Sequence, residues 1–232
     1  MVYFFTAEYE SASSTEQYPE FQTFDVYMGK NQSENELLIK YGHPEDVWFH
    51  VDNLSSAHVY FRMKPGMTMD DVPKEAILDC ATMVKANSIA GCKKSEVTVV
   101  YTRWKNLKKT HGTPDGTVGF HRPDNVRRIR VKKDNFRVKS FEKTRTEQLD
   151  KVEEMLSKSQ ERRLKEIQRQ KKEHNRMEQK AKKKAYQAQQ IEKHNKSYDR
   201  IHIDNAHKMT SSREMAATAD STAAEEYEDD FF

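Results

Sequence analysis

The hydrophobic and polar positions of this chain divide it into a strand-rich first part and a helical second part. Before about residue 140, short runs of β-branched and aromatic residues are separated by turn-forming residues. After that point, helix-favouring residues continue without Gly or Pro. The pattern predicts a folded domain over residues 1–135, a long basic helix over 136–205 and a disordered acidic tail over 206–232.

Two strands joined by a short loop are expected at the centre of the folded part, within residues 47–62. Side chains on a strand alternate between its faces, so Trp48 and His50 are expected on the face opposite Phe49. His50 and His58 therefore flank one turn, each within an otherwise apolar strand.

Further strands are expected on either side of this pair. Residues 2–7 and 21–28 are expected to pair as a hairpin, and residues 96–102 form a strand rich in valine. The segment 117–131 is expected to form a closing hairpin that turns at residues 123–125.

Two helices are expected between the strands. Ser33 and Glu36 fit a capping box that opens a short helix ending near Tyr41. After Pro73, apolar residues recur at helical spacing and form a stripe suited to packing on a sheet. This order favours an α+β fold, with a twisted, largely antiparallel sheet and two helices, followed by the long charged helix and the acidic tail.

The charged residues support this division. The chain is 35% hydrophobic and 33% charged, with a mean hydropathy of -1.00, which is too polar for one compact globule. The formal net charge is only +3, but residues 1–60 carry ten acids and two bases, and residues 102–133 carry ten bases and two acids. A folded domain with that asymmetry presents a basic face, which predicts a polyanionic partner.

The number of cysteines and the length of the apolar segments indicate the cellular compartment in which the protein is expected. Cys80 and Cys92 are too few for a disulfide framework, and neither has a Cys or His at metal-ligand spacing. The first residues lack the basic segment of a signal peptide, and no apolar run approaches the ~18 residues that cross a bilayer. We therefore expect a soluble protein of a reducing compartment, the cytoplasm, with the nucleus as an alternative.

One interpretation of His50, Asp52 and His58 is a metal site or a general base, because three such side chains near one turn can serve as ligands. No further carboxylate, cysteine or activated nucleophile accompanies them, and a histidine within a strand is more often a core or rim residue satisfied by one hydrogen bond. We favour that second interpretation, in which His50 and His58 line a polar groove. The sequence thus predicts no catalytic residue, no metal and no cofactor.

A basic segment over residues 101–112 interleaves lysines and an arginine with Trp104. This combination suits single-stranded nucleic acid, because cations follow the phosphates and an aromatic face stacks a nucleobase at ~1–3 kcal/mol. The alternative is that Trp104 is a lid on the core and the lysines form an ordinary solvated face. A second basic cluster over residues 122–130 favours polyanion binding.

The candidate nucleic-acid-binding residues follow from these segments. Lys30 and Asn31 are included because a helix N-terminus with a lysine beside it is a ready anion site. The full set is Lys30, Asn31, His50, His58, Trp104, Lys105, Lys108, Lys109, Arg122, Arg127 and Arg128.

Several segments of the folded part, Asp46–Val51 and Ala57–Val59 among them, resemble the NFACT-R module, an RNA-binding domain of ribosome quality-control proteins. The resemblance covers about residues 1–135, and a lone module followed by a basic charged helix is similar to the family of coiled-coil domain-containing protein 25. It rests on Tyr27–Asn31, Asp46–Val51, Ala57–Val59, Val97–Thr102, Lys108–Lys109 and Gly116–Gly119.

The resemblance implies a partner and a mode of action. It implies RNA, either tRNA or ribosome-associated RNA, in translation quality control, without catalysis, because the N-terminal half of the longer NFACT proteins is lacking. In one departure, the longer proteins usually have a Pro-Gly-Ser-like sequence before the second histidine, where this chain has Ser55, Ser56 and Ala57. The loss of glycine removes easy access to positive φ.

Several alternatives stay open for the partner. A DNA-binding or DNA-sensing protein would use the same basic face, and a scaffold would dock a ribosome or protein partner through the C-terminal helix. Leu149 and Leu156 begin a heptad pattern that then degrades, so that only a weak homodimer is expected. Peripheral contact with anionic lipid is a further alternative, although the helix lacks a clear apolar face.

Overall fold

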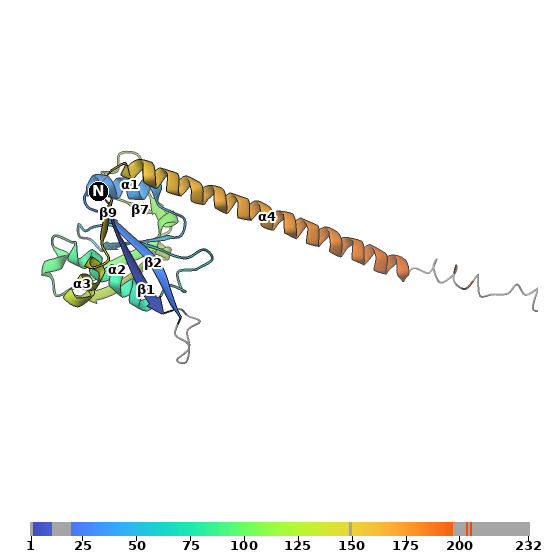
Figure 1. Cartoon of the computed structure of the whole chain (residues 1–232), viewed down its shortest axis with the longest axis horizontal. Coiled ribbons are helices and arrows are strands. Elements are labelled where there is room, and N and C mark those ends of the chain that lie inside the picture. Colours follow the sequence, from blue (N-terminus) through green and yellow to red (C-terminus); the bar gives the residue numbers. More distant parts are fainter. Residues whose placement is uncertain (1, 11–19, 149, 197–202, 204, 206–232) are drawn as a thin grey trace, which may run out of the picture. The chain divides into compact units, whose positions relative to one another are not determined.

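The computed structural model describes residues 2–10, 20–148, 150–196, 203 and 205 (Figure 1). The chain divides into two units, residues 1–166 and residues 167–232. The first unit holds a sheet with its covering helices and the beginning of the long helix α4 (Val152–Asn195). The rest of α4 belongs to the second unit.

A seven-stranded sheet forms the centre of the first unit, and all its neighbouring strands are antiparallel. The strands lie in the order β8 (Arg127–Lys132), β5 (Glu96–Arg103), β3 (Asp46–Val51), β4 (Val59–Arg62), β2 (Phe21–Gly29), β1 (Val2–Glu10) and β9 (Thr146–Gln148). Two short strands, β6 (Leu107–Lys108) and β7 (Gly119–Phe120), pair separately. The predicted α+β class is confirmed, and so are the hairpins of β1 with β2 and of β3 with β4.

Helices cover both faces of the sheet. α2 (Lys74–Ala86) and α3 (Asn135–Glu142) cover one face, called the α2 face, and α1 (Gln32–Tyr41) with the first turns of α4 covers part of the other, called the α1 face (Figure 1). Phe49 belongs to the core on the α2 face and Trp48 to the core on the α1 face. The alternation predicted for the central strand is therefore confirmed.

The N-terminus of α1 differs from the prediction. Asn31, not Ser33, is the N-cap, and its side chain accepts a hydrogen bond from the backbone N–H of Glu34 at 3.0 Å. The Asn/Ser-x-x-Glu spacing of a capping box occurs twice in this segment. Glu36, the acid of the second pair, is instead bound to Lys109 at 2.7 Å, so the first pair forms the cap.

The expected closing hairpin over residues 117–131 is wrong. β7 pairs with β6, whereas β8 pairs with β5 and places Val131 opposite Val97. Both valines belong to the core on the α2 face. Burial of this apolar pair on the main sheet outweighs the local turn signal at residues 123–125, which form a single 3-10 turn.

The segment after residue 135 is not one continuous helix. Asp134 caps the short helix α3 by accepting two backbone N–H groups of its first turn, and Phe141 of α3 is buried. β9 then pairs with β1 at the edge of the sheet, and α4 begins only at Val152. Pairing with a sheet edge thus overrides helix propensity here. The predicted acidic tail over 206–232 lies outside the described residues.

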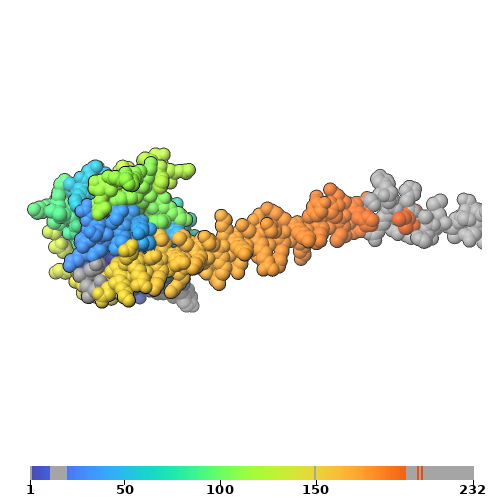
Figure 2. All heavy atoms as spheres, turned by 90° about the horizontal axis from the view of Figure 1, so that it is seen from above, coloured from blue at the N-terminus to red at the C-terminus, as the bar shows by residue number. Residues whose placement is uncertain are grey.

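The first turns of α4 pack on the α1 face. Val152 and Leu156 are buried in its apolar cluster, and the hydroxyl of Tyr41 donates to the carboxylate of Glu153 at 2.8 Å. Figure 2 shows these first turns, in yellow, against the blue surface that includes α1. This apolar burial fixes where α4 begins.

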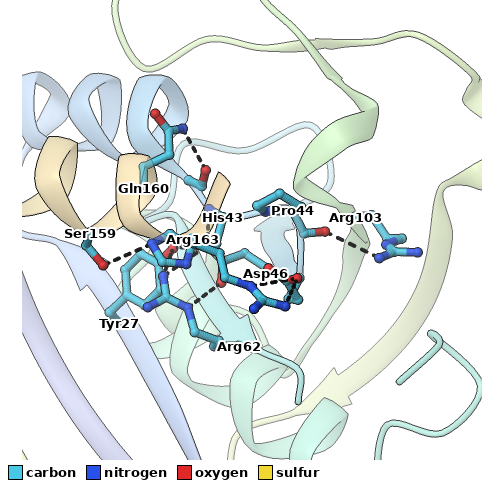
Figure 3. Close-up of polar contacts among 11 residues, drawn as sticks. Tyr27, His43, Pro44, Asp46, Arg62, Arg103, Ser159, Gln160 and Arg163 are labelled. Carbon is cyan, nitrogen blue, oxygen red and sulfur yellow. Dashed lines mark hydrogen bonds and ion pairs between the residues drawn. The ribbon is translucent and has the colours of Figure 1, made fainter. Parts of the chain in front are cut away.

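Polar contacts extend the docking by two more turns of α4 (Figure 3). They connect α4 with the segment between α1 and β3, which is itself buried. The contacts are His43 Nε2 with Ser159 Oγ at 3.1 Å, Gln160 Nε2 donating to the Gly42 carbonyl at 2.8 Å, and Arg163 with the carboxylate of Glu45 at 2.7 Å.

A fully buried carboxylate lies beneath this docking contact. Asp46 accepts hydrogen bonds from the Tyr27 hydroxyl, from the backbone N–H of His43 at 2.6 Å and from Arg62 Nε at 2.9 Å (Figure 3). Because a buried charge is tolerated only when it is paired and hydrogen-bonded, these donors account for its presence on the α1 face.

Two general features were also expected from the sequence. Cys80 and Cys92 are both free thiols. Within the part of the chain that the structure describes, no helix, α4 included, is both long and apolar enough to cross a membrane.

Candidate nucleic-acid interface

A groove of about 900 Å³ opens on the α1 face of the sheet. Its walls are the turn between β3 and β4, the N-terminus of α1 and the segment 115–120. The predicted site residues Lys30, Asn31, His50 and His58 all line it. The fold therefore brings the two predicted histidines of a polar groove together with the two residues predicted for the N-terminus of the first helix.

Aromatic rings form the floor of the groove. The ring of His50 stacks on the indole of Trp48 with centroids 5.3 Å apart and an interplanar angle of 6°. His58 stands edge-on to both, at 5.2 Å from Trp48 and 5.1 Å from His50. Phe120 of β7 meets Trp48 at 5.8 Å. Trp48 and His58 are buried, so the ring surface open to a planar nucleobase is that of His50 and Phe120, which are half-buried.

Both histidines of the floor are neutral near neutral pH. Burial lowers the pKa of His58 to about 3, with a smaller contribution from the neighbouring His50. Burial also lowers the pKa of His50 below its ordinary value. They therefore offer ring surface and neutral hydrogen-bonding atoms rather than positive charge.

Two polar atoms of the floor lack a hydrogen-bond partner among the described residues. They are Nδ1 of His58 and Nε1 of Trp48, and both side chains are almost completely buried. An unpaired buried polar group costs about 1–3 kcal/mol, and native proteins contain few of them. Both atoms lie beneath the groove, whose lining includes Trp48 and His58.

The turn that forms one wall is held rigidly. The hydroxyl of Ser88 at the end of α2 donates to the Ser55 carbonyl at 2.6 Å, and Ala57 N–H donates to the Asn87 carbonyl at 3.2 Å. Asn53 has φ 58° and supplies the left-handed residue of this turn. Asparagine tolerates that conformation better than most residues, so the turn forms without the glycine of the longer proteins.

The N-terminus of α1 is less open to an anion than the sequence predicted. The carboxylate of Glu34 accepts the backbone N–H groups of Lys30 at 2.8 Å and of Asn31 at 3.3 Å. Those amides are the donors that a phosphate would need. Lys30 therefore contributes its exposed side chain to the groove, whereas Asn31 acts as the helix cap.

Arg128 lies on the same face of the sheet as His50. In the strand register, Arg128 of β8 is opposite Val100 of β5, and Val100 is opposite His50 of β3. The guanidinium of Arg128 is 3.7 Å from the carboxylate of Asp52 and is largely exposed. It supplies a cation at the rim of the groove.

A second, strongly basic pocket of about 500 Å³ lies beside the end of β5. We call it the basic pocket, and the cationic side chains that line it are Arg103, Lys105, Arg122 and Arg127, with Asp124 as the acidic one. Arg127 is fixed by Asp70 at 2.6 Å, whereas Lys105 and Arg122 are exposed. Three of the predicted site residues meet here.

One buried amide shapes the basic pocket. Asn106 Nδ2 donates to the Arg122 carbonyl at 2.9 Å, and Asn106 Oδ1 accepts the Arg122 backbone N–H at 2.8 Å. This pair holds the segment 117–125, which lines the groove with Phe120 and the basic pocket with Arg122. The two sites are thus neighbours on one segment.

The candidate residues predicted from the sequence omit two residues of this pocket. Arg103 could have been included, because it belongs to the same basic segment as Lys105. Asn106 carries no signal in the sequence, because its importance depends on a hydrogen bond to a residue sixteen positions away.

Trp104 packs as a lid on α1. Its Nε1 donates to the Ile39 carbonyl at 2.8 Å, and its ring lies so close to Gly42 that a Cβ there would fall 2.2 Å from the indole. Of the two interpretations of Trp104, these contacts agree with the core lid, and its stacking role stays a prediction.

Lys109 and Lys108 have different environments. Lys109 Nζ is bound to Glu36 at 2.7 Å and donates to the carbonyls of Pro114 at 2.9 Å and Thr117 at 3.2 Å. It therefore fastens a loop to α1. Lys108 is exposed on β6, opposite Gly119 and next to the groove residue Phe120.

No metal-ligand cluster occurs within the residues that the structure describes: no group of three or more His, Cys, Asp or Glu is placed to hold an ion. The Asp52 carboxylate contacts Arg128. The rings of His50 and His58 contact each other in a T-shaped arrangement.

The chain is similar to proteins of known family. Residues 1–122 match the family described as NFACT protein RNA binding domain, which supports a nucleic-acid-binding role. Coiled-coil domain-containing protein 25 of Mus musculus is 51% identical over 63% of this chain and 67% of its own length, and that of Danio rerio is 49% identical over 70% and 75%. Protein JLP2 of Saccharomyces cerevisiae is 37% identical over 68% and 74%.

Proposed function

Because this chain belongs to the NFACT-R family, we propose that it is a non-catalytic RNA-binding protein that binds tRNA or ribosome-associated RNA in translation quality control. In this proposal the basic pocket holds phosphates and the groove holds an unpaired base. The working compartment would be the cytoplasm, where translation takes place.

The observation that carries the proposal is the basic pocket. Four cationic side chains line about 500 Å³ with a single carboxylate among them. Like charges are gathered at a site only against their mutual repulsion, and a polyanion relieves that repulsion. Arginine suits this partner because its planar guanidinium can pair with two phosphate oxygens at once.

The groove favours RNA over a polyanion that is recognised by its charge alone. Its floor is aromatic and its two histidines are neutral, so it offers a nucleobase ring contacts and hydrogen bonds rather than charge. Sequence-specific RNA recognition mostly targets unpaired bases that are splayed out and stacked on aromatic side chains. Lys30 and Arg128 at the rim would hold the adjoining phosphates.

The absence of catalysis is part of the proposal. His50 and His58 are the side chains in the groove best suited to acid–base chemistry, and their pKa values are lowered by burial. A general acid works best with a pKa near the working pH, and that of His58 lies far below it. Their chemistry favours binding over proton transfer.

The proposal is tested by binding labelled tRNA and a single-stranded DNA of matched sequence to the full chain over a salt series. The variant Lys105→Gln with Arg122→Gln removes two exposed bases of the basic pocket. We expect tRNA to bind more tightly than DNA, and the variant to lose about tenfold in affinity. The slope of log affinity against log salt should fall by about 1.5, because each phosphate contact contributes about 0.7–0.9.

The matched control is Lys74→Gln with Lys139→Gln, which removes the same charge from exposed positions on α2 and α3. It should change the affinity by less than about twofold, since exposed charges away from the site act only through a screened field. Equal binding of RNA and DNA would favour the DNA-binding alternative. Equal losses in the two variants would exclude the basic pocket as the phosphate site.

A further inference from the structure

The part of α4 in the second unit is an exposed helix. Every described residue from Gln168 to Lys196 is exposed. The helix is supported locally by Glu→Lys ion pairs at i,i+4 spacing, which include Glu161 with Lys165 and Glu178 with Lys182, both at 2.6 Å. Each such pair contributes about 0.3–0.5 kcal/mol, and the order with Glu first suits the helix dipole.

The bases of α4 are not spread evenly around it. With 3.6 residues per turn, successive residues are about 100° apart, so each position of the helix can be assigned to a face. Between residues 158 and 183, every position within about 40° of one line along the helix is a base. These eight residues, called the basic stripe, are Lys158, Arg162, Lys165, Arg169, Lys172, Arg176, Lys180 and Lys183.

The basic stripe is separate from the face of α4 that docks. Val152, Leu156 and Arg163 make the docking contacts, and the helical wheel places them roughly 100° or more from the centre of the stripe. Docking of the first turns therefore leaves Lys158 and Arg162 exposed. The stripe is available along its whole length.

The residues around the stripe argue against an apolar partner. Met177, Tyr186 and Ile191 are the large exposed apolar side chains of the distal helix. Met177 and Ile191 share one face but are two heptads apart with Lys184 between them, and Tyr186 lies on the opposite face. A coiled coil needs a continuous apolar seam, and an interfacial helix needs a broad apolar face. Neither is present among the described residues of α4.

The geometry of the stripe fits a regular polyanion. Its bases recur every three or four residues, which is about one positive charge per 5 Å along a length of about 37 Å. A nucleic-acid duplex presents one phosphate per ~3.4 Å of each strand along a comparable length. Such a row of cations can follow one edge of a phosphate backbone.

We propose that the basic stripe of α4 is a second RNA-binding site, which tracks the phosphate backbone of the RNA bound by the first unit. This inference rests on the proposed function. In this proposal the RNA contacts one face of the helix, whereas attraction by net charge alone would favour no face. Binding should not depend on base sequence along this stretch, because phosphates carry no sequence information.

The chain offers two sets of four lysines that lie on different faces of the helix. The stripe variant carries Lys165→Gln, Lys172→Gln, Lys180→Gln and Lys183→Gln, and the control variant carries Lys171→Gln, Lys182→Gln, Lys184→Gln and Lys193→Gln. Each set removes four positive charges and one i,i+4 ion pair, that of Lys165 or that of Lys182. Circular dichroism should show equal helix content in both variants.

The measurement is the affinity of the full chain for labelled tRNA over a salt series. We expect the stripe variant to lose about tenfold or more and its salt slope to fall by about 3, since four phosphate contacts are removed. The control variant should lose about twofold to threefold, with its slope nearly unchanged. This difference between faces is the signature of the stripe.

Other outcomes would overturn the inference. Equal losses of affinity in the two variants would show that α4 attracts RNA through its net charge, without a preferred face. No loss in either variant would mean that RNA binds to the first unit alone. Stripe-dependent binding to vesicles of phosphatidylcholine and phosphatidylserine, with unchanged tRNA affinity, would assign the stripe to a membrane. If the wild-type chain bound no tRNA, the proposed function would fail together with the stripe, whereas the first three results reject the stripe alone.

Discussion

The two faces of the central sheet are made by the same strands and carry opposite chemistry. On the α2 face, β3 presents Val47, Phe49 and Val51 to a continuous apolar core. On the α1 face, the same strand presents Asp46, Trp48 and His50, which make ionic and aromatic contacts beside an apolar cluster that includes Val100. Alternation along one strand thus places the apolar core on one side and, on the other, the side chains to which we assign RNA binding.

The two faces differ in the kinds of groups that they bury. The α2 face buries hydrocarbon, and each buried side chain contributes about 1.5–3 kcal/mol. The α1 face buries the Asp46 carboxylate with its donors and leaves His58 Nδ1 and Trp48 Nε1 unpaired beneath the groove.

The strongest test of the difference between the two faces uses two adjacent residues of β3 that point to opposite faces. Phe49→Ala should lower the free energy of unfolding by about 3–5 kcal/mol, because it opens a cavity where Phe49 stacks on Tyr101 at 5.3 Å. His50→Ala should cost less stability, since His50 is only half-buried, but should weaken tRNA binding about tenfold through lost stacking.

Urea unfolding and tRNA titration of the two variants would measure these effects. The folded fraction of Phe49→Ala should bind tRNA with nearly wild-type affinity, because its side chain faces away from the groove. If both variants lost stability and affinity in the same proportion, the two faces would not have separate roles.

Acid should destabilise the α1 face through a smaller effect. The pKa of His58 is about 3 in the folded chain and about 6.5 when unfolded, so the unfolded state takes up the proton first as the pH falls. The stability is present above pH 6.5 and is lost between about 6.5 and 3, which amounts to about 2 kcal/mol from pH 7 to pH 5. His43 and His50 shift in the same direction.

The variant His58→Gln isolates this contribution. It should be less stable than the wild type at pH 7, because a packed ring is removed, but should lose about 2 kcal/mol less between pH 7 and pH 5. Urea unfolding at the two pH values provides the measurement. An identical loss in the wild type and the variant would mean that His58 titrates normally in the fold.

The sequence predicted the features that depend on local periodicity. The alternation of Trp48, Phe49 and His50 placed each residue on its correct face, because a strand has a period of two whatever its partners are. The end of α1 at Tyr41 was likewise fixed by the Gly42 that follows it.

Features that depend on distant partners could not be predicted in this way. β9 is three residues long and forms only because the edge of β1 is open to it. The residues around Trp104 give no sign of the hydrogen bond from its indole nitrogen to the Ile39 carbonyl at 2.8 Å. Those around Lys109 give no sign of its ion pair with Glu36. In each case the deciding contact joins residues more than sixty positions apart.

Ultraviolet crosslinking of tRNA to the full chain, followed by mass spectrometry of the crosslinked peptides, tests the central claim most directly. If the groove binds an unpaired base, we expect crosslinks in the peptides that contain Trp48, His50 and Phe120, which form its floor. These crosslinks should disappear in His50→Ala. Crosslinks confined to peptides of α2 and α3, on the opposite face, would contradict the account.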